Sequence, residues 1–144
     1  MKRDDALFYL CSLIEFIGRR RKLERSRVVD ALGEETLRRI YNYADVFHCE
    51  PIEKTADDFI RLCAVPEGVF DNVAACRYRV PDYWMIGEVY ERLIEDVNDG
   101  DVIETLRRVY ASWISEALSD YNTDFYYQPR DYVSECCRAG EVLD

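Results

Sequence analysis

The chain has 144 residues, a hydrophobic share of 49% and a formal net charge of −10. This length fits one domain, and this composition can fill a core without help from a metal or disulfides. The acidic balance argues against general binding of nucleic acids or anionic membranes, and it favours solubility or a basic partner.

The charge is unevenly distributed along the chain. Residues 1–40 hold ten Lys and Arg against seven Asp and Glu, whereas residues 41–144 hold nine against twenty-two. The two parts therefore carry +3 and −13, and one can attract the other within a molecule or between copies. The alternative is a set of ordinary solvated helix faces.

We predict a cytoplasmic protein. No segment has the roughly 18 uninterrupted apolar residues of a membrane span. The N-terminus resembles a signal peptide only in part, because Asp4 and Asp5 precede the apolar run and Glu15 interrupts it. The six cysteines contain no C-x-x-C unit, so we expect reduced thiols that act mainly as small apolar side chains.

The first predicted helix covers residues 7–17, where apolar side chains recur at helical spacing on more than one face. Gly18 and the basic run 19–22 are expected to end it.

Three further helices are predicted before residue 65. Ser26 is expected to cap a short helix that stops at Gly33, and residues 37–47 then continue with one apolar face. Thr55 with Asp58 resembles a capping box for a helix that buries residues 59–63.

Residues 65–81 read as a connector. Cys76, Tyr78 and Val80 alternate with Arg77 and Arg79, which is the pattern of a short half-buried strand. No partner strand is visible, so we predict a connector that is extended in part.

The C-terminal part returns to helical spacing. Helices are predicted from Asp82 and from Asp101, joined by the short turn 98–100 as an antiparallel hairpin. A last helix begins near Pro129 and ends at Gly140. The sequence thus predicts an all-α, compact bundle of about six or seven helices. Its parts are 1–64, 65–81 and 82–144, packed as one domain.

Two residues could support polar chemistry on the N-terminal side. His48 is the only histidine, and Cys49 follows it. Neighbours on a helix point about 100° apart, so they are poorly placed as a nucleophile pair. Zinc needs about four ligands, and we therefore predict no metal and no cofactor. A helix-terminal histidine with a structural hydrogen bond is the simpler interpretation.

Two other functions remain as alternatives. Glu88, Glu91, Glu95 and Asp96 share one predicted helix and would suit a small acidic enzyme if burial separated their pKa values. A solvated face is the alternative. The glycine turn at Gly33 also suits a helix-turn-helix regulator, although acidic residues at the start of its second helix would face DNA phosphates.

The C-terminal loop is rich in aromatic side chains. One interpretation is a partner surface, because tyrosine suits interfaces. In a second interpretation, which we place before the first, the loop folds back and closes the core, and in a third it forms a ligand pocket. The basic turn after the first helix is a further candidate. The predicted surface residues are Tyr121, Phe125, Tyr126, Tyr127, Tyr132, Arg19, Arg20 and Arg21.

Residues 5–62 resemble a family of short bacterial helical proteins of unknown function. The resemblance rests on Leu7–Leu10, Val28–Leu32, Tyr41–His48 and Asp57–Ile60. Genes of that family often stand beside one for an ADP-ribosyltransferase-like protein of toxin type. The resemblance implies a partner or neutralising role, and it provides no catalytic residues.

Taken together, the sequence predicts a non-enzymatic protein-interaction module that binds another protein or a second copy of itself.

Overall fold

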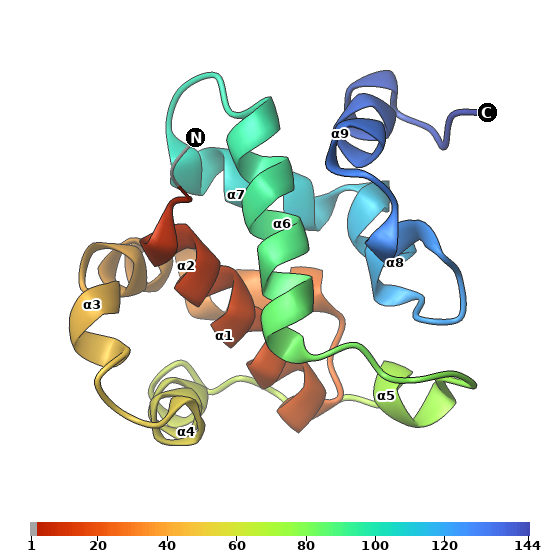
Figure 1. Cartoon of the computed structure of the whole chain (residues 1–144). Coiled ribbons are helices and arrows are strands. Elements are labelled where there is room, and N and C mark those ends of the chain that lie inside the picture. The colour runs from red at the N-terminus through yellow and green to blue at the C-terminus, as the bar shows by residue number, and fades with distance from the viewer. Residues whose placement is uncertain (1–2) are drawn as a thin grey trace.

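The computed structural model describes residues 3–144 and is helical throughout, with no strand in that range (Figure 1). The predicted all-α class is confirmed. The elements are α1 (Asp5–Arg21), α2 (Arg25–Asn42), α3 (Ala44–Phe47), α4 (Ile52–Leu62), α5 (Asn72–Ala75), α6 (Tyr83–Val97), α7 (Val102–Ala111), α8 (Trp113–Ser119), the 3₁₀ turn η1 (Phe125–Tyr127) and α9 (Arg130–Ala139).

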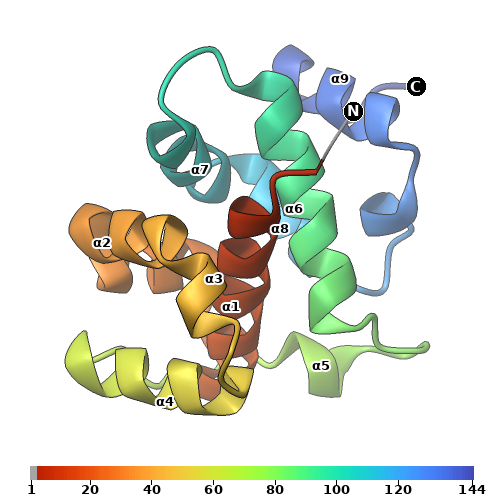
Figure 2. The same cartoon turned by 60° about the vertical axis from the view of Figure 1, so that its left-hand side comes forward.

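Helix α1 is the centre of the molecule. It lies between α6 on one side and the group formed by α2, α3 and α4 on the other (Figure 2). Leu10, Leu13 and Ile17 are completely buried, as the apolar faces of this segment predict. One continuous cluster of buried side chains joins α1 to α6, α7 and α8, so the predicted N-terminal and C-terminal parts share a core.

Helices α1 and α6 cross at short distance in this core. Gly87 of α6 faces the backbone of Ser12, and a Cβ atom at Gly87 would lie 2.8 Å from both Cα and N of Ser12. Real Cβ atoms do not approach backbone atoms that closely, so a glycine is required at this contact.

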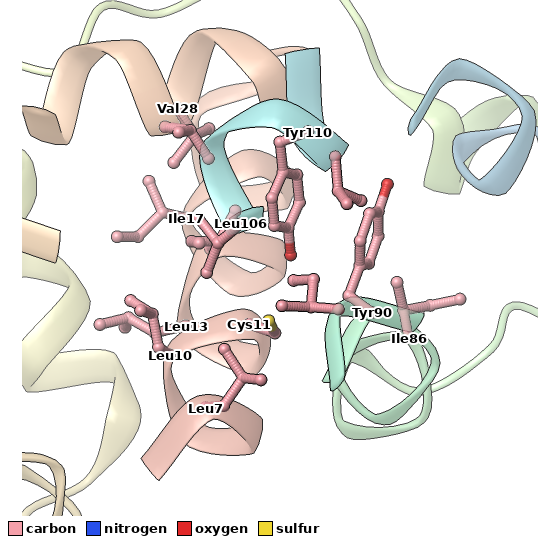
Figure 3. Packing of buried hydrophobic residues seen from close by; sticks show 14 of the residues in the cluster. Leu7, Leu10, Cys11, Leu13, Ile17, Val28, Ile86, Tyr90, Leu106 and Tyr110 are labelled. Carbon is pink, nitrogen blue, oxygen red and sulfur yellow. The ribbon is translucent and has the colours of Figure 1, made fainter. Parts of the chain in front are cut away.

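A pair of stacked tyrosines joins the C-terminal helices. The rings of Tyr90 on α6 and Tyr110 on α7 lie 4.2 Å apart and nearly parallel (Figure 3). The Tyr90 hydroxyl reaches the hydroxyl of Ser115 on α8 at 2.9 Å. Aromatic packing thus holds together the helices that are predicted to follow Asp82 and Asp101.

Local capping signals fix several helix ends. Asp82 accepts a hydrogen bond from the backbone N–H of Trp84, and Asp101 accepts from Ile103 and Glu104. Gly140 adopts a left-handed conformation after α9. These three predicted boundaries are confirmed because each depends only on residues nearby in the chain.

The predicted end of α1 in the basic run is confirmed: the helix continues through Gly18, ends at Arg21 and has Lys22 as its left-handed cap. Two other predicted boundaries are wrong. Ser26 does not cap α2, which begins one residue earlier. Thr55 is buried inside α4, which starts directly after Pro51. In each case contacts that are distant in sequence, or the fixed φ of proline, outweigh the local capping preference.

Over the described residues 3–144, the α-helices number nine rather than six or seven, because two predicted segments are interrupted and the connector adds one short helix. Gly33 does not add to this number: it takes the non-helical angles φ 79° and ψ 163° at the predicted stop, but the helical segments on either side of this kink count as one element, α2. The predicted helix 37–47 breaks at Tyr43 to give α3, and Ser112 separates α7 from α8. The connector 65–81 contains the single turn α5. Within residues 3–144, no helix combines the length and apolarity needed to cross a bilayer.

We expect Gly87→Ala to destabilise the protein by about 1–3 kcal/mol, because the new methyl group must push α6 away from α1. Gly100→Ala is the matched control, since nothing lies within 4 Å of a Cβ there. Chemical denaturation of both variants measures the difference. Equal stability of the two variants would contradict the close crossing.

Candidate functional site

A buried ion network lies where α1 meets the start of α2. Arg25 is fully buried and donates from Nε to Oε1 of Glu15 at 2.9 Å and from Nη2 to Oε2 at 3.0 Å. Arg19 donates from Nε to Oε2 of Glu15 at 2.8 Å. The hydroxyl of Tyr121 also donates to Glu15. Glu15 is therefore a buried carboxylate with three donor side chains.

The network keeps Glu15 ionised. Burial by itself would raise the pKa of this carboxyl group, but the two guanidinium groups hold the pKa lowered to about 2. Burial and the neighbouring Glu15 carboxylate raise the pKa of Tyr121 to about 12, so its hydroxyl stays protonated as a donor. A charge of this kind is stable in a core only when every partner is in place.

The same network fixes two loops that lie apart in the sequence. Arg25 Nη2 donates to Oδ1 of Asn72, and Asn72 Nδ2 donates to the carbonyl of Ser119, both at 3.0 Å. Arg19 Nη2 donates to the carbonyl of Pro81 at 2.7 Å. The segment before α6 and the loop after α8 are thus anchored to one buried charge.

These two loops form an exposed face that we call the tyrosine–arginine surface. Tyr78 and Tyr127 are 68% and 64% exposed, and Met85 is also exposed. The surface consists of Arg77, Tyr78, Arg79, Tyr83, Met85, Tyr126 and Tyr127.

Asn122 joins the two loops directly. Its Oδ1 accepts from the backbone N–H of Arg77 at 2.7 Å, and its Nδ2 donates to the carbonyl of Ala75 at 3.0 Å. The ring of Tyr126 packs edge-on against Tyr121, which is buried, and against Tyr127. The backbone under the surface is therefore held in place, while its outer side chains face solvent.

Two hollows lie on this face. One has a volume of about 680 Å³ and is bordered by Pro81, Tyr83 and Met85. The other, of about 450 Å³, is bordered by Tyr78 and Asn122. Arg79 lines both hollows, together with Tyr126 and Tyr127. The arrangement offers contact area and charge rather than a reaction centre.

The structure separates the predicted aromatic surface into two groups. Tyr121 and Phe125 are buried, so the prediction that they face a partner is corrected: they close the core, as the second interpretation holds. Tyr126 is half-buried and Tyr127 is exposed. Tyr132 is half-buried on α9, where its hydroxyl donates to the carbonyl of Leu143.

The residues of the predicted basic surface form ion pairs within the chain, and Arg20 remains exposed. Arg19 belongs to the buried network, Arg20 pairs with Asp57, and Arg21 pairs with Glu67. These cations join α1 to more acidic segments of the same chain. The attraction expected between the two unequally charged parts therefore operates within the molecule.

His48 and Cys49 lie at the end of α3 and are exposed. The His48 ring packs edge-on against Tyr9 and Trp84, with centroids 5.5 and 6.1 Å away. The Cys49 thiol donates to the carbonyl of Asp45. Within residues 3–144, no three His, Cys, Asp or Glu side chains gather in a way that could hold a metal ion.

His48 borders a further hollow, of about 630 Å³, together with Arg3, Asp5, Tyr9 and Tyr41. Arg3 and Asp5 pair with each other at its rim. The Tyr41 hydroxyl donates to Asp4 at 2.7 Å. Arg3, Asp5 and the Tyr41 hydroxyl thus have partners in the chain, whereas the buried hydroxyl of Tyr9 has no hydrogen-bond partner.

Glu91 is the most unusual of the acidic side chains on α6. It is 1% exposed, and neither of its carboxyl oxygens has a hydrogen-bond partner. Burial and the neighbouring Glu95 raise its pKa to about 8, whereas Arg130 and Ser134 lower the pKa of Asp96 against the effect of burial. The pKa values thus diverge as acid–base chemistry requires. Glu91, however, lines none of the five hollows described on this molecule, so no substrate reaches it through them.

The helix-turn-helix alternative gains no support from the second half of α2. Arg38 pairs with Asp101, and Glu34 pairs with Arg107 of α7. The start of this helix segment therefore packs against α7 by ion pairs.

Sequence reasoning missed three features of the site. Glu15 interrupts a segment that is apolar on all sides, and a charge in such a place indicates a buried ion pair. The alternation around Tyr78 was visible, but its exposed face could not be recognised without Asn122, which lies 45 residues later. The burial of Glu91 left no local signal.

Comparison with known proteins found no family model that matches this chain, and no curated protein or solved structure similar to it.

We expect Arg25→Met to destabilise the protein by about 3–5 kcal/mol, because it leaves Glu15 buried without its main partner. Arg27→Met is the matched control: Arg27 is exposed and pairs loosely with Glu24 at 3.8 Å, a pair worth about 0–1 kcal/mol. Thermal and urea unfolding compare the two. A loss for Arg25→Met no larger than for Arg27→Met would contradict the role of the network.

Glu91 predicts an unusual pH dependence. Its pKa is raised on folding, so the unfolded chain releases this proton from about pH 4.5 while the folded chain holds it to about pH 8. The raised pKa of Glu91 lowers the free energy of unfolding. This loss of stability is absent at low pH and grows as pH rises through this window. We expect Glu91→Gln to gain stability relative to the parent protein between pH 5 and pH 8, on the order of 2 kcal/mol.

The matched control for this measurement is Glu116→Gln, on an exposed residue of α8. Its difference from the parent protein at pH 5 and at pH 8 is the baseline for the comparison. A constant difference for Glu91→Gln would show that Glu91 does not hold its proton.

Proposed function

We propose that this protein is a non-enzymatic protein-interaction module and that the tyrosine–arginine surface is its binding face. The observation that carries the proposal is the set of large side chains left exposed on two anchored loops, foremost Tyr78 and Tyr127. Tyrosine, methionine and arginine are enriched in protein interfaces, and this surface combines all three types.

Pre-organisation supports this proposal. Asn122 and the buried network hold the loops before binding, so a partner does not have to order the backbone. Less ordering means a smaller entropic penalty for the same contact area. The two hollows give a partner side chain places to enter, which is how interface anchors usually bind.

The resemblance of residues 5–62 suggests the kind of partner. It leads us to propose that the chain binds, and neutralises, an ADP-ribosyltransferase-like protein of toxin type encoded beside it. Neutralisation needs only that a bound surface block the toxin, so it needs no catalytic residue in this chain.

The test is coexpression with the ADP-ribosyltransferase-like protein of the neighbouring gene, followed by co-purification and a growth assay. We expect the native chain to co-elute with that protein and to restore growth. Tyr78→Ala with Tyr127→Ala should weaken binding at least about tenfold, because exposed aromatic anchors dominate interface energies.

Tyr43→Ala is the matched control, since Tyr43 is an exposed tyrosine outside this surface, between α2 and α3. Folding of each variant is checked by circular dichroism. If the double variant binds as tightly as the control, or if the native chain does not bind at all, the proposal fails.

A further inference from the structure

Most cations of this protein are paired internally. Of the eighteen Lys and Arg side chains in residues 3–144, fifteen lie within 4.0 Å of an acid. This is expected for a chain with ten more acids than bases. The three exceptions in the described range are Arg39, Arg77 and Arg79. Two of the three flank Tyr78 on the tyrosine–arginine surface.

The backbone that carries these two arginines is fixed at both ends. The N–H of Arg77 donates to Asn122, and the carbonyl of Pro81 accepts from Arg19. Arg19 is itself held by Glu15 inside the core. The side chains of Arg77 and Arg79 are exposed, so the fold places two unneutralised guanidinium groups on a rigid support.

Apolar area lies directly beside the charge. Arg79 borders the 680 Å³ hollow together with Pro81, Tyr83 and Met85, and it borders the 450 Å³ hollow together with Tyr78. A bound segment therefore meets a guanidinium group and an apolar recess within one short span. Guanidinium groups bind carboxylates through paired hydrogen bonds.

We propose that the tyrosine–arginine surface binds an acidic segment of another protein, with carboxylates at Arg77 and Arg79 and an apolar side chain in the hollow beside Met85. This inference rests on the proposed function and adds to it the chemistry of the partner.

The surroundings favour a short peptide segment over a nucleic acid or a second copy. Asp82 borders one of these hollows and Asp124 the other, and the chain carries −10 overall, so the charge beyond the two arginines repels a long polyphosphate. Two copies, each at −10, repel one another for the same reason. A short segment with a few carboxylates is attracted locally and avoids most of the remaining charge.

The first experiment uses a phage-displayed library of random twelve-residue peptides, selected against the immobilised full-length protein. We expect the enriched peptides to contain Asp or Glu close to a large apolar residue. One enriched peptide, made with a fluorescent label, is then titrated by anisotropy, and its binding should weaken as salt is raised.

Charge reversal locates the binding. Arg79→Glu should weaken this peptide at least about tenfold, whereas Arg39→Glu should leave it unchanged, because Arg39 is equally unpaired but lies on α2. Tyr127→Ala should also weaken it. Arg79→Lys should bind the peptide more tightly than Arg79→Glu but more weakly than the native protein, since lysine keeps the charge and loses only the paired hydrogen bonds.

Three outcomes would overturn the inference, and they separate it from the proposed function. Enriched peptides without acids that still require Tyr127 would refute the acidic partner and leave the binding surface standing. If neither Arg79→Glu nor Tyr127→Ala changes the binding of the peptide, or if no peptide is enriched, both the inference and the proposed function are refuted. Tight binding of a single-stranded oligonucleotide, or a dimer by light scattering that Arg79→Glu dissociates, would assign the arginines to nucleic acid or to a second copy.

Discussion

The fold depends on how it accommodates one buried carboxylate. Glu15 lies on the central helix, where there is no solvent to stabilise its charge. Arg25, Arg19 and Tyr121 supply the donors that water would otherwise supply. Gly18 allows this, because a Cβ at that position would meet the Arg25 guanidinium at 2.7 Å or less. Ion pairs of this kind add little net stability but strongly disfavour other arrangements, in which the charge is left alone.

The same requirement connects the core with the exposed face. Tyr121, one of these donors, belongs to the loop after α8, and the other two, Arg19 and Arg25, also donate to Pro81 and Asn72 in the segment before α6. Satisfying Glu15 therefore also fixes the two loops that carry the tyrosine–arginine surface. The buried network beneath the surface therefore makes the surface rigid. Damage to the buried network should loosen the binding face even though no surface residue is altered.

The acidic composition has two consequences that point in opposite directions. Basic side chains near the N-terminus pair with acids far along the chain, as Arg20 with Asp57 and Arg38 with Asp101 do, which helps to gather the helices. The composition also places Glu91 near Glu95 on α6. Burial, and after it this neighbouring acid, raise the pKa of Glu91, so that it holds a proton that an exposed glutamate would lose. This buried acid is a source of pH sensitivity and has no access to a substrate in the hollows described here.

The sequence alone determined the helical class, the apolar faces of α1, and the helix ends at Asp82, Asp101 and Gly140, because these depend on periodicity and on residues within a few positions. It also indicated that the C-terminal tyrosines either cover the core or face a partner. Only the tertiary structure decided between these. Tyr121 turns inward because its hydroxyl meets Glu15, 106 residues earlier, while Tyr127 finds no such acceptor and stays exposed. Gly87, the unpaired arginines and the buried Glu91 were likewise decided by contacts between distant segments, for which a single sequence carries no local signal.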